Sequence, residues 1–154
     1  MLAQQLTDLF ERNHVYYKRL VHATAYTSQG VAAATHVPGR EVAKTVVVRI
    51  DGSFVLAVLP APLRVDLERL RKAVGGETAA LATEAELERL FPGCEVGAEP
   101  PFGELYGLPV WVEASLLEDE WIVFNGGTHG EAVEISYADF ERLAHPRVAR
   151  FARE

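Results

Sequence analysis

Cysteine is almost absent from this sequence, and its scarcity excludes several kinds of protein. Cys94 is the only cysteine among 154 residues, so the chain can form neither an internal disulfide nor a cysteine cluster that holds zinc. The histidines show no metal-ligand spacing either; they stand at positions 14, 22, 36, 129 and 145. We therefore expect no metal and a reducing, cytoplasmic environment.

Long hydrophobic runs are missing as well. No apolar stretch approaches the ~20 residues that a membrane-spanning helix requires. The segment from Met1 to Arg12 carries Asp8 and Glu11 and lacks the basic start and apolar centre of a signal peptide. We therefore expect no membrane partner.

Positive charge is in short supply, because 15 lysines and arginines face 22 acidic residues and give a formal net charge of −7. Charge-driven binding to DNA or to long stretches of RNA uses basic surfaces, so this balance weighs against it. A partner that places only a short RNA end in a pocket is still compatible with this acidic charge balance. Apolar residues, by contrast, make up 49% of the chain, enough for the core of one domain over residues 1–154.

Turn and capping signals divide the chain into short helices and strands. Asp51-Gly52 between two apolar runs favours a hairpin with a type I′ turn, and Thr83 with Glu86 forms a capping box. Strands are expected at 15–21, 42–50, 54–59, 109–112, 121–124 and 133–135, and helices at 2–12, 28–34 with Thr27 or Ser28 as cap, 67–74, 83–90, 137–143 and after 146, where Arg147, Arg150 and Arg153 recur every third residue. These elements mix without strict alternation. We expect an α+β domain with a mixed, largely antiparallel central sheet flanked by helices.

The common catalytic signatures are missing too. The sequence has no Gly-x-Ser-x-Gly, no Gly-x-x-x-x-Gly-Lys-Ser/Thr and no His-Glu-x-x-His motif. Cys94 is a conceivable nucleophile, but nothing near it in the sequence would activate a thiol. A buried, inert cysteine is the favoured interpretation.

Lys44 stands out within the first strand of the expected hairpin. Because side chains alternate along a strand, Lys44 shares a face with Val46 and Val48. Such a lysine either extends its ammonium group to solvent, which the pattern alone favours, or points its charge into a pocket. In a pocket it could bind a phosphate or stabilise a developing oxyanion.

Two glycine-containing loops are the other candidates. Residues 97–103 (Gly-Ala-Glu-Pro-Pro-Phe-Gly) are stiffened by two prolines, and residues 125–129 (Asn-Gly-Gly-Thr-His) follow an apolar strand. Each loop is either a simple turn, the safer interpretation on chemistry alone, or a place where a ligand approaches the backbone closely. His129 is either an exposed loop residue, which is favoured, or a proton carrier near neutral pH.

Taken in order, these motifs resemble a known family. Residues 43–48 (Ala-Lys-Thr-Val-Val-Val), 58–61 (Val-Leu-Pro-Ala), the loop at 97–103 and residues 124–127 (Phe-Asn-Gly-Gly) follow the pattern of the YbaK/EbsC family. That family is the aminoacyl-tRNA editing, or deacylase, domain found alone or inserted in prolyl-tRNA synthetases. The similarity covers about residues 15 to 145, and the ordered set is more specific than any one motif.

The resemblance implies a trans-editing hydrolase that cleaves the ester of mischarged aminoacyl-tRNA without a protein nucleophile or a cofactor. It implies that Lys44 is the catalytic lysine, orienting the terminal adenosine's phosphate or the scissile ester, and that backbone amides of the Gly97 loop polarise the carbonyl. The substrate-binding residues implied are Gly97, Ala98, Glu99, Pro100, Pro101, Phe102, Asn125, Gly127 and, as a candidate for the histidine of the prolyl-tRNA synthetase insert, His129. Glu99 adds a negative charge that could alter selectivity.

The partner implied by the resemblance is the acceptor end of aminoacyl-tRNA. We expect contact with it to be limited and to be helped by the arginines of the tail or by an aminoacyl-tRNA synthetase. Two other functions are kept open: a non-catalytic module of the same fold that binds tRNA or an aminoacyl ligand, and a purely structural partner protein. Lys44 and the glycine loop favour the enzyme.

Overall fold

The computed structural model describes residues 4–21, 28–35 and 37–154. The helices are α1 (Gln4–Arg12), α2 (Ser28–Thr35), α3 (Leu67–Val74), α4 (Glu84–Leu90) and α5 (Tyr137–Ala144), with 3-10 turns at Gly39–Glu41, Gly103–Tyr106 and Ala114–Glu118. The strands are β1 (Lys18–Val21), β2 (Ala43–Ile50), β3 (Ser53–Pro60), β4 (Arg64–Val65), β5 (Ala79–Leu81), β6 (Val110–Glu113), β7 (Trp121–Asn125), β8 (Glu131–Ser136), β9 (Arg147–Ala149) and β10 (Ala152–Arg153). Within these ranges, every helix is too short or too polar to cross a membrane.

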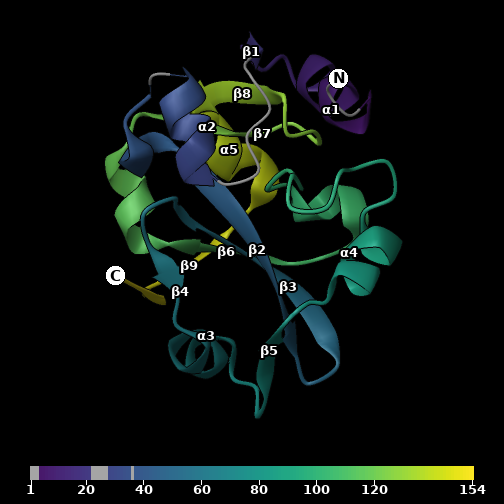
Figure 1. The fold of residues 1–154 in the computed structure, drawn as a ribbon, viewed down its shortest axis with the longest axis vertical. Coiled ribbons are helices and arrows are strands. Elements are labelled where there is room, and N and C mark those ends of the chain that lie inside the picture. Colours follow the sequence, from purple (N-terminus) through teal and green to yellow (C-terminus); the bar gives the residue numbers. More distant parts are fainter. Residues whose placement is uncertain (1–3, 22–27, 36) are drawn as a thin grey trace.

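One long hairpin, β2–β3, runs through the whole molecule (Figure 1). The two strands pair over their full length, from Ala43 opposite Pro60 to Ile50 opposite Ser53. Asp51 and Gly52 connect them with φ values of 52° and 88°, the two positive values that a type I′ turn requires. The predicted hairpin is therefore confirmed.

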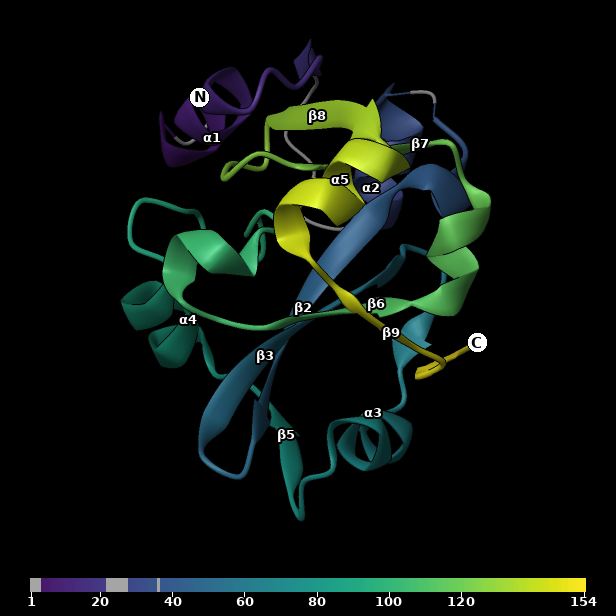
Figure 2. The ribbon, with the colours of Figure 1, turned by 180° about the vertical axis from the view of Figure 1, so that it is seen from behind.

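The hairpin forms the centre of a five-stranded sheet with the order β5-β2-β3-β6-β9. β5, β2 and β3 are antiparallel, whereas β6 adds to β3 in parallel and β9 adds to β6 in parallel. A second, antiparallel sheet has the order β1-β8-β7, and a two-stranded ladder joins β4 to β10. Figures 1 and 2 place the second sheet and α2 at one end of the hairpin and α3 and β5 at the other. This mixed, largely antiparallel α+β arrangement is the fold predicted from the sequence.

The central sheet separates two apolar cores. Alternate residues of the hairpin, such as Val47 and Val58, face the larger core, which includes α1, α5 and Phe102. Val48 and Leu59 face the smaller core, which α3 closes with Leu70 and the chain end with Phe151. Val46 packs against this smaller core, so Lys44 belongs to its side of the sheet, as strand alternation predicts.

Two sequence predictions of local structure were wrong. The tail after residue 146 forms the short strands β9 and β10 instead of a helix, because its backbone pairs with β6 and β4. The strand expected from residue 15 begins only at Lys18, because Val15 N–H donates to Phe10 O (3.0 Å) and His14 has a positive φ of 54°. Leu2, Thr27 and the side chain of Ser28 lie outside what the structure describes, and so does the expected cap of α2.

A buried carboxylate fixes the end of the chain to the sheet. Glu113, at the end of β6, is only 4% exposed. Its Oε1 accepts hydrogen bonds from the backbone N–H groups of Phe151 (3.0 Å) and Ala152 (3.2 Å), and its Oε2 accepts from Ser115 N–H and Oγ. Burial opposes the charged form, but these hydrogen bonds outweigh it and lower the pKa of Glu113 from its ordinary value of 4.5.

We predict that Glu113→Gln lowers the free energy of unfolding by about 1–3 kcal/mol at neutral pH, because hydrogen bonds to a buried charge are weakened. A folded-state pKa below the unfolded value stabilises the fold above that value, and this contribution disappears as the pH falls through the folded pKa. The difference between wild type and Glu113→Gln in urea unfolding should therefore shrink below about pH 4.5. Exposed Glu118→Gln is the control; an equal loss in both variants would contradict the role given to Glu113.

Candidate active site

The site begins where β2 is open on one side. Val42, just before β2, forms a parallel bridge with Val123 of β7. β5 pairs with β2 only from Val48 onward, with one further hydrogen bond from Ala82 N–H to Val47 O. Between these points, no strand in the described part of the chain covers this side of β2, and Lys44 lies in the gap.

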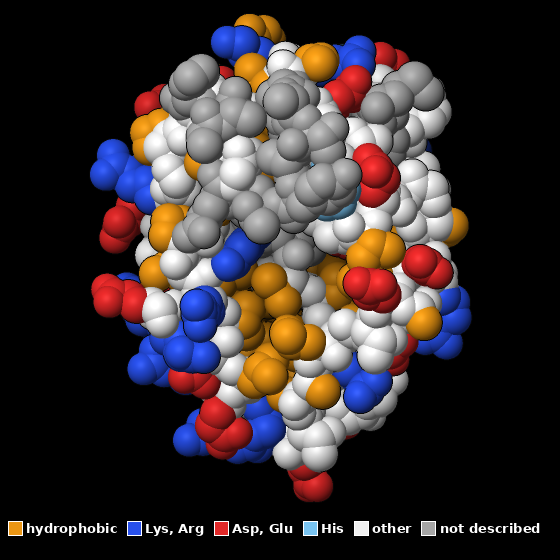
Figure 3. Space-filling model, in the orientation of Figure 1, with side chains coloured by type: hydrophobic (Ala, Val, Ile, Leu, Met, Phe, Trp, Pro, Cys, Tyr) orange, Lys and Arg blue, Asp and Glu red, His pale blue; other side chains and the backbone are white. Residues whose placement is uncertain are grey.

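Beside this gap the surface is hollowed into a groove of about 520 Å³, which we call the Lys44 groove. Its lining is apolar in the middle and mostly cationic around it: Lys44, Val46, Arg64, Val65, Asp66, Leu67, Leu81 and Arg153. Figure 3 shows hydrophobic side chains gathered in the hollow, with Lys and Arg side chains along its left side. The groove therefore offers positive charge next to apolar surface.

Lys44 is partly buried at this position. Desolvation by burial lowers the pKa of its ammonium group, and the nearby positive charge of Arg64 lowers it further. Across the described residues, no carboxylate forms an ion pair with Lys44. The lysine thus lines a pocket, which is the alternative that the sequence pattern alone disfavoured.

The loop from Gly97 is held by its own hydrogen bonds. Gly97 has φ +89°, and its N–H donates to Oε1 of Glu99 (3.0 Å). Ala98 is fully buried, and its N–H donates to Glu95 O (3.0 Å). The amides of Gly97 and Ala98 are therefore already used within the loop, so these two do not polarise a scissile carbonyl in this conformation.

The remaining residues of this loop are buried. Pro100 and Pro101 are both buried, and Glu99 is only 4% exposed. Burial is the largest influence on Glu99 and raises the pKa of its carboxyl group. Phe102 is 1% exposed, and its ring contacts those of Phe10, Phe124 and Phe140, with centroids 5.5–5.9 Å apart. Phe102 therefore anchors the loop in the core and does not contribute to a surface that a substrate contacts.

The second loop is bound directly to the first. Gly127 N–H donates to Ala98 O (3.0 Å), and Gly127 O accepts from Glu95 N–H (2.8 Å). His129 Nε2 lies 2.8 Å from Val96 O, a distance that fits Nε2 as the protonated nitrogen. His129 is only 5% exposed, so the favoured prediction of a solvent-exposed loop histidine was wrong. Its ring supports the first loop from behind Gly97.

Register brings Lys44 to the level of the second loop. Val42 and Val123 are bridged in parallel, and Lys44 and Asn125 each follow two residues later. Corresponding residues of parallel strands lie side by side, so the strands place these two polar residues at the same level. The bridge therefore places the start of β2 beside β7, which leads into the second loop, and hydrogen bonds join the second loop to the first.

Two polar side-chain atoms of the second loop are buried without a hydrogen-bond partner in the described structure. They are Asn125 Oδ1 and Thr128 Oγ1. A buried polar atom without a partner costs roughly 1–3 kcal/mol, so such atoms are usually paired. Sequence reasoning had named Asn125 but had not singled out Thr128.

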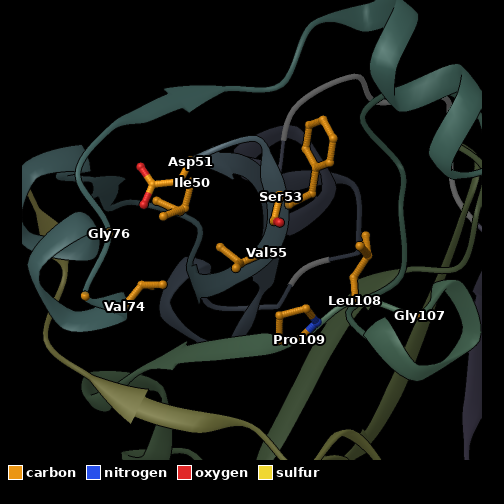
Figure 4. Close-up of a pocket in the computed structure, with 11 residues that line it drawn as sticks. Ile50, Asp51, Ser53, Val55, Val74, Gly76, Gly107, Leu108 and Pro109 are labelled. Carbon is orange, nitrogen blue, oxygen red and sulfur yellow. The ribbon is translucent and has the colours of Figure 1, made fainter.

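A larger hollow, of about 670 Å³, lies at the turn end of the hairpin (Figure 4). Its walls are mainly apolar, with Ile50, Val55 and Val74 among them. The only charged side chain that lines it is Asp51, whose carboxylate accepts hydrogen bonds from the N–H groups of Glu77 and Thr78. The one charge among the described lining residues is used in holding the turn, so this hollow offers no cation for an ester oxygen or a phosphate, despite its size.

Cys94 has no feature of a nucleophile. Its Sγ lies 3.3 Å from the hydroxyl of Tyr106, and burial raises the pKa of the thiol, so the reactive thiolate is disfavoured. This agrees with the interpretation of an inert cysteine.

Comparison with known proteins identifies the family. Residues 22–143 match the aminoacyl-tRNA editing domain family. The chain belongs to this family. The activity class predicted from the resemblance, a hydrolase that edits mischarged aminoacyl-tRNA, is thereby confirmed. The chain is 31% identical over 156 residues to the Multifunctional Ser/Thr-tRNA deacylase ProXp-y of Escherichia coli, in both strain K12 and strain O157:H7, and the alignment covers 97% of this chain and 92% of the relative.

Solved structures share the fold of this editing domain. A crystal structure named provisionally as a trans-editing enzyme for prolyl tRNA synthetase superposes with a TM-score of 0.84 at 22% identity, covering 100% of both chains. The crystal structure of hypothetical protein APE2540 gives a TM-score of 0.88 at 21% identity, covering 97% of this chain and 100% of the other.

We predict that Gly97→Ala destabilises the editing domain and changes its selectivity. A positive φ costs a non-glycine residue roughly 1–2 kcal/mol, and the new methyl group would lie 3.4 Å from His129 Cε1. Gly52→Ala is the matched control, because Gly52 has φ +88° and nothing within 4 Å of an added Cβ. Thermal unfolding should show a lower melting temperature than the wild type for both variants. Only Gly97→Ala should alter the relative rates at which different amino acids are removed from tRNA, and unchanged relative rates would show that this loop does not set selectivity.

Proposed function

We propose that this editing domain hydrolyses the ester between a mischarged amino acid and the terminal adenosine of tRNA at the open side of β2, next to Lys44. The observation that carries the proposal is the partly buried ammonium group of Lys44, which has no carboxylate partner in the described residues and lies level with Asn125. An unneutralised cation in a partly dry site is suited to stabilising negative charge that develops on an ester oxygen.

The reaction needs few protein groups. Water adds to the ester carbon while Lys44 stabilises the oxyanion, and the bond from carbon to the ribose oxygen then breaks. The attacking water loses a proton, and the departing ribose oxygen gains one. Because the amides of Gly97 and Ala98 are used within their loop, Lys44 carries the electrostatic stabilisation in this scheme.

We further propose that the preferred amino acids carry a side-chain hydroxyl. The buried, unpartnered Asn125 Oδ1 and Thr128 Oγ1 would both gain from a hydroxyl group placed against them. A site with unpaired polar groups strongly rejects an analogue that lacks the matching polar group. Serine and threonine fit this requirement, and they are the amino acids in the name of the Escherichia coli relative. An aminoacyl-tRNA synthetase as a second partner stays a prediction.

Lys44→Ala should abolish deacylation of Ser-tRNA without lowering the melting temperature. Burial and the charge of Arg64 both disfavour the ammonium form of Lys44, so replacing the lysine removes no interaction that stabilises the fold. Single-turnover deacylation of preformed Ser-tRNA measures the first effect and calorimetry the second. Lys72→Ala, on exposed α3, is the control for loss of a lysine. Wild-type turnover by a folded Lys44→Ala protein would contradict the catalytic role proposed for Lys44.

Asn125→Leu should remove the preference for a hydroxyl group. Two pairs of substrates isolate the hydroxyl group. Ser-tRNA and Ala-tRNA differ by its presence, and in Val-tRNA a methyl group replaces the hydroxyl group of Thr-tRNA. We expect the wild type to favour the hydroxyl member of each pair, and Asn125→Leu to lose roughly tenfold or more of that ratio, since one hydrogen bond to a buried group is worth about 1–2 kcal/mol. Equal ratios in wild type and variant would place the selectivity elsewhere.

A further inference from the structure

Five arginines of this acidic protein form ion pairs within the described structure. Arg19 pairs with Glu131, Arg49 with Glu86, Arg69 with Asp66, Arg71 with Glu68 and Arg142 with Asp139. Arg64 and Arg153 line the groove and have no ion-pair partner among the described residues. Together with Lys44, which also has no ion-pair partner among the described residues, they bring three cations to one groove on a chain whose net charge is −7.

The two arginines stand directly opposite each other. Arg153 of β10 pairs with Arg64 of β4 in antiparallel register. Like charges at facing positions of two strands repel and cost stability. Arg64 also acts on Lys44, since its charge lowers the pKa of the lysine. Three cations thus gather at one groove at a cost to the fold, and an anion in the groove would offset that cost.

The strand that carries Arg153 is held firmly. Glu113 accepts the N–H groups of Phe151 and Ala152, and Phe151 O accepts from Asp66 N–H (2.7 Å). Arg69 Nη1 donates to Ala152 O (2.9 Å). These hydrogen bonds fix the backbone on either side of the ladder, so the position of Arg153 beside the groove follows from buried contacts.

The acidic residue in the groove does not neutralise these cations. Asp66 accepts a hydrogen bond from Arg69 N–H (3.0 Å) as the cap of α3, and its other oxygen lies 3.7 Å from Arg69 Nε. Its carboxylate is therefore directed to the helix and to Arg69. The middle of the groove is aliphatic, formed by Val46, Leu67 and Leu81 among others, with no aromatic ring among the described lining residues.

We propose that Arg64 and Arg153 bind phosphate groups of the single-stranded 3′ end of the tRNA and lead its terminal ester to Lys44. The proposal rests on the editing function and adds the residues that hold the RNA. Arginine binds phosphate through two parallel hydrogen bonds, and the aliphatic floor can cover a ribose or a base without selecting among bases. The groove accordingly recognises the RNA backbone, and one small cationic site suffices for an otherwise acidic surface.

The tail arginines then differ in their roles, although they are evenly spaced in sequence. Arg153 lines the groove, whereas Arg147 lies over the ring of Trp111, 5.8 Å from its centroid. Arg150 is exposed and lines no part of the groove. This makes Arg150 a control of equal charge in the same segment.

The test is binding of an uncharged acceptor-stem RNA hairpin with a single-stranded 3′ end to the protein with Lys44 intact; this RNA has no ester, so binding is measured without turnover. Arg64→Gln and Arg153→Gln should each raise the Kd about tenfold at low salt, and Arg150→Gln by less than twofold. Each groove variant should also reduce the slope of log Kd against log salt by about 0.7, the value for one phosphate contact on a single strand. A hairpin without the overhang should bind weakly and respond little to either variant.

The thermal stability of both groove variants should be equal to or above that of the wild type, because like-charge repulsion is removed. Unchanged affinity in folded groove variants, equal weakening by Arg150→Gln, or equal binding of the hairpin without overhang would each overturn the proposal. Failure of the editing function would show itself differently, as no deacylation by the wild type even though the RNA binds in an arginine-dependent way.

Discussion

The proposed site depends on one unneutralised charge, the ammonium group of Lys44 in a partly buried groove. Burial and the charge of Arg64 both act against this group, and no described carboxylate compensates for them. Such a group contributes little to folding, and its cost is understandable if negative charge reaches it during the reaction. The fold then serves to keep it in place: a full-length hairpin fixes the strand, and a gap in strand pairing leaves its side open.

The two glycine-containing loops have different roles, which their sequences alone do not suggest. Residues 97–103 look like a backbone cradle, yet their first amides are bonded to Glu99 and Glu95. The loop instead provides a stiff wall, anchored by Phe102 and supported by His129. The second loop contributes buried polar atoms without partners, which is where selectivity for a hydroxyl group is proposed.

Much of this architecture could be predicted from the sequence because its signals are local. Asp51-Gly52 specifies the hairpin, Thr83 and Glu86 form the predicted capping box, and Ser136 caps α5. The tail was mistaken for a helix because arginines every third residue suit a helical face, whereas its actual structure depends on pairing with distant strands. Periodicity within a segment cannot register such partners.

The same contrast between local signals and distant contacts applies to the site. Lys44 and both loops were named from an ordered set of motifs. Arg64 and Arg153 were not grouped with Lys44, because Arg64 and Arg153 are 89 positions apart in the sequence. Only the β4–β10 ladder brings the two arginines together. The burial of Glu99 and His129 was likewise hidden: glutamate is usually exposed, histidine is intermediate, and the burial of both depends on contacts that distant parts of the chain make.

Whether the ammonium form of Lys44 carries the reaction is decided by comparing two titrations. The first is the ionisation of Lys44, followed by NMR of its side chain; the second is the pH dependence of enzymatic Ser-tRNA deacylation, corrected for spontaneous hydrolysis. The account predicts that activity falls at high pH together with the protonated form of Lys44, with a pKa below 10.5, and that Arg64→Gln moves both titrations to higher pH. Activity that stays constant while Lys44 loses its proton would contradict it.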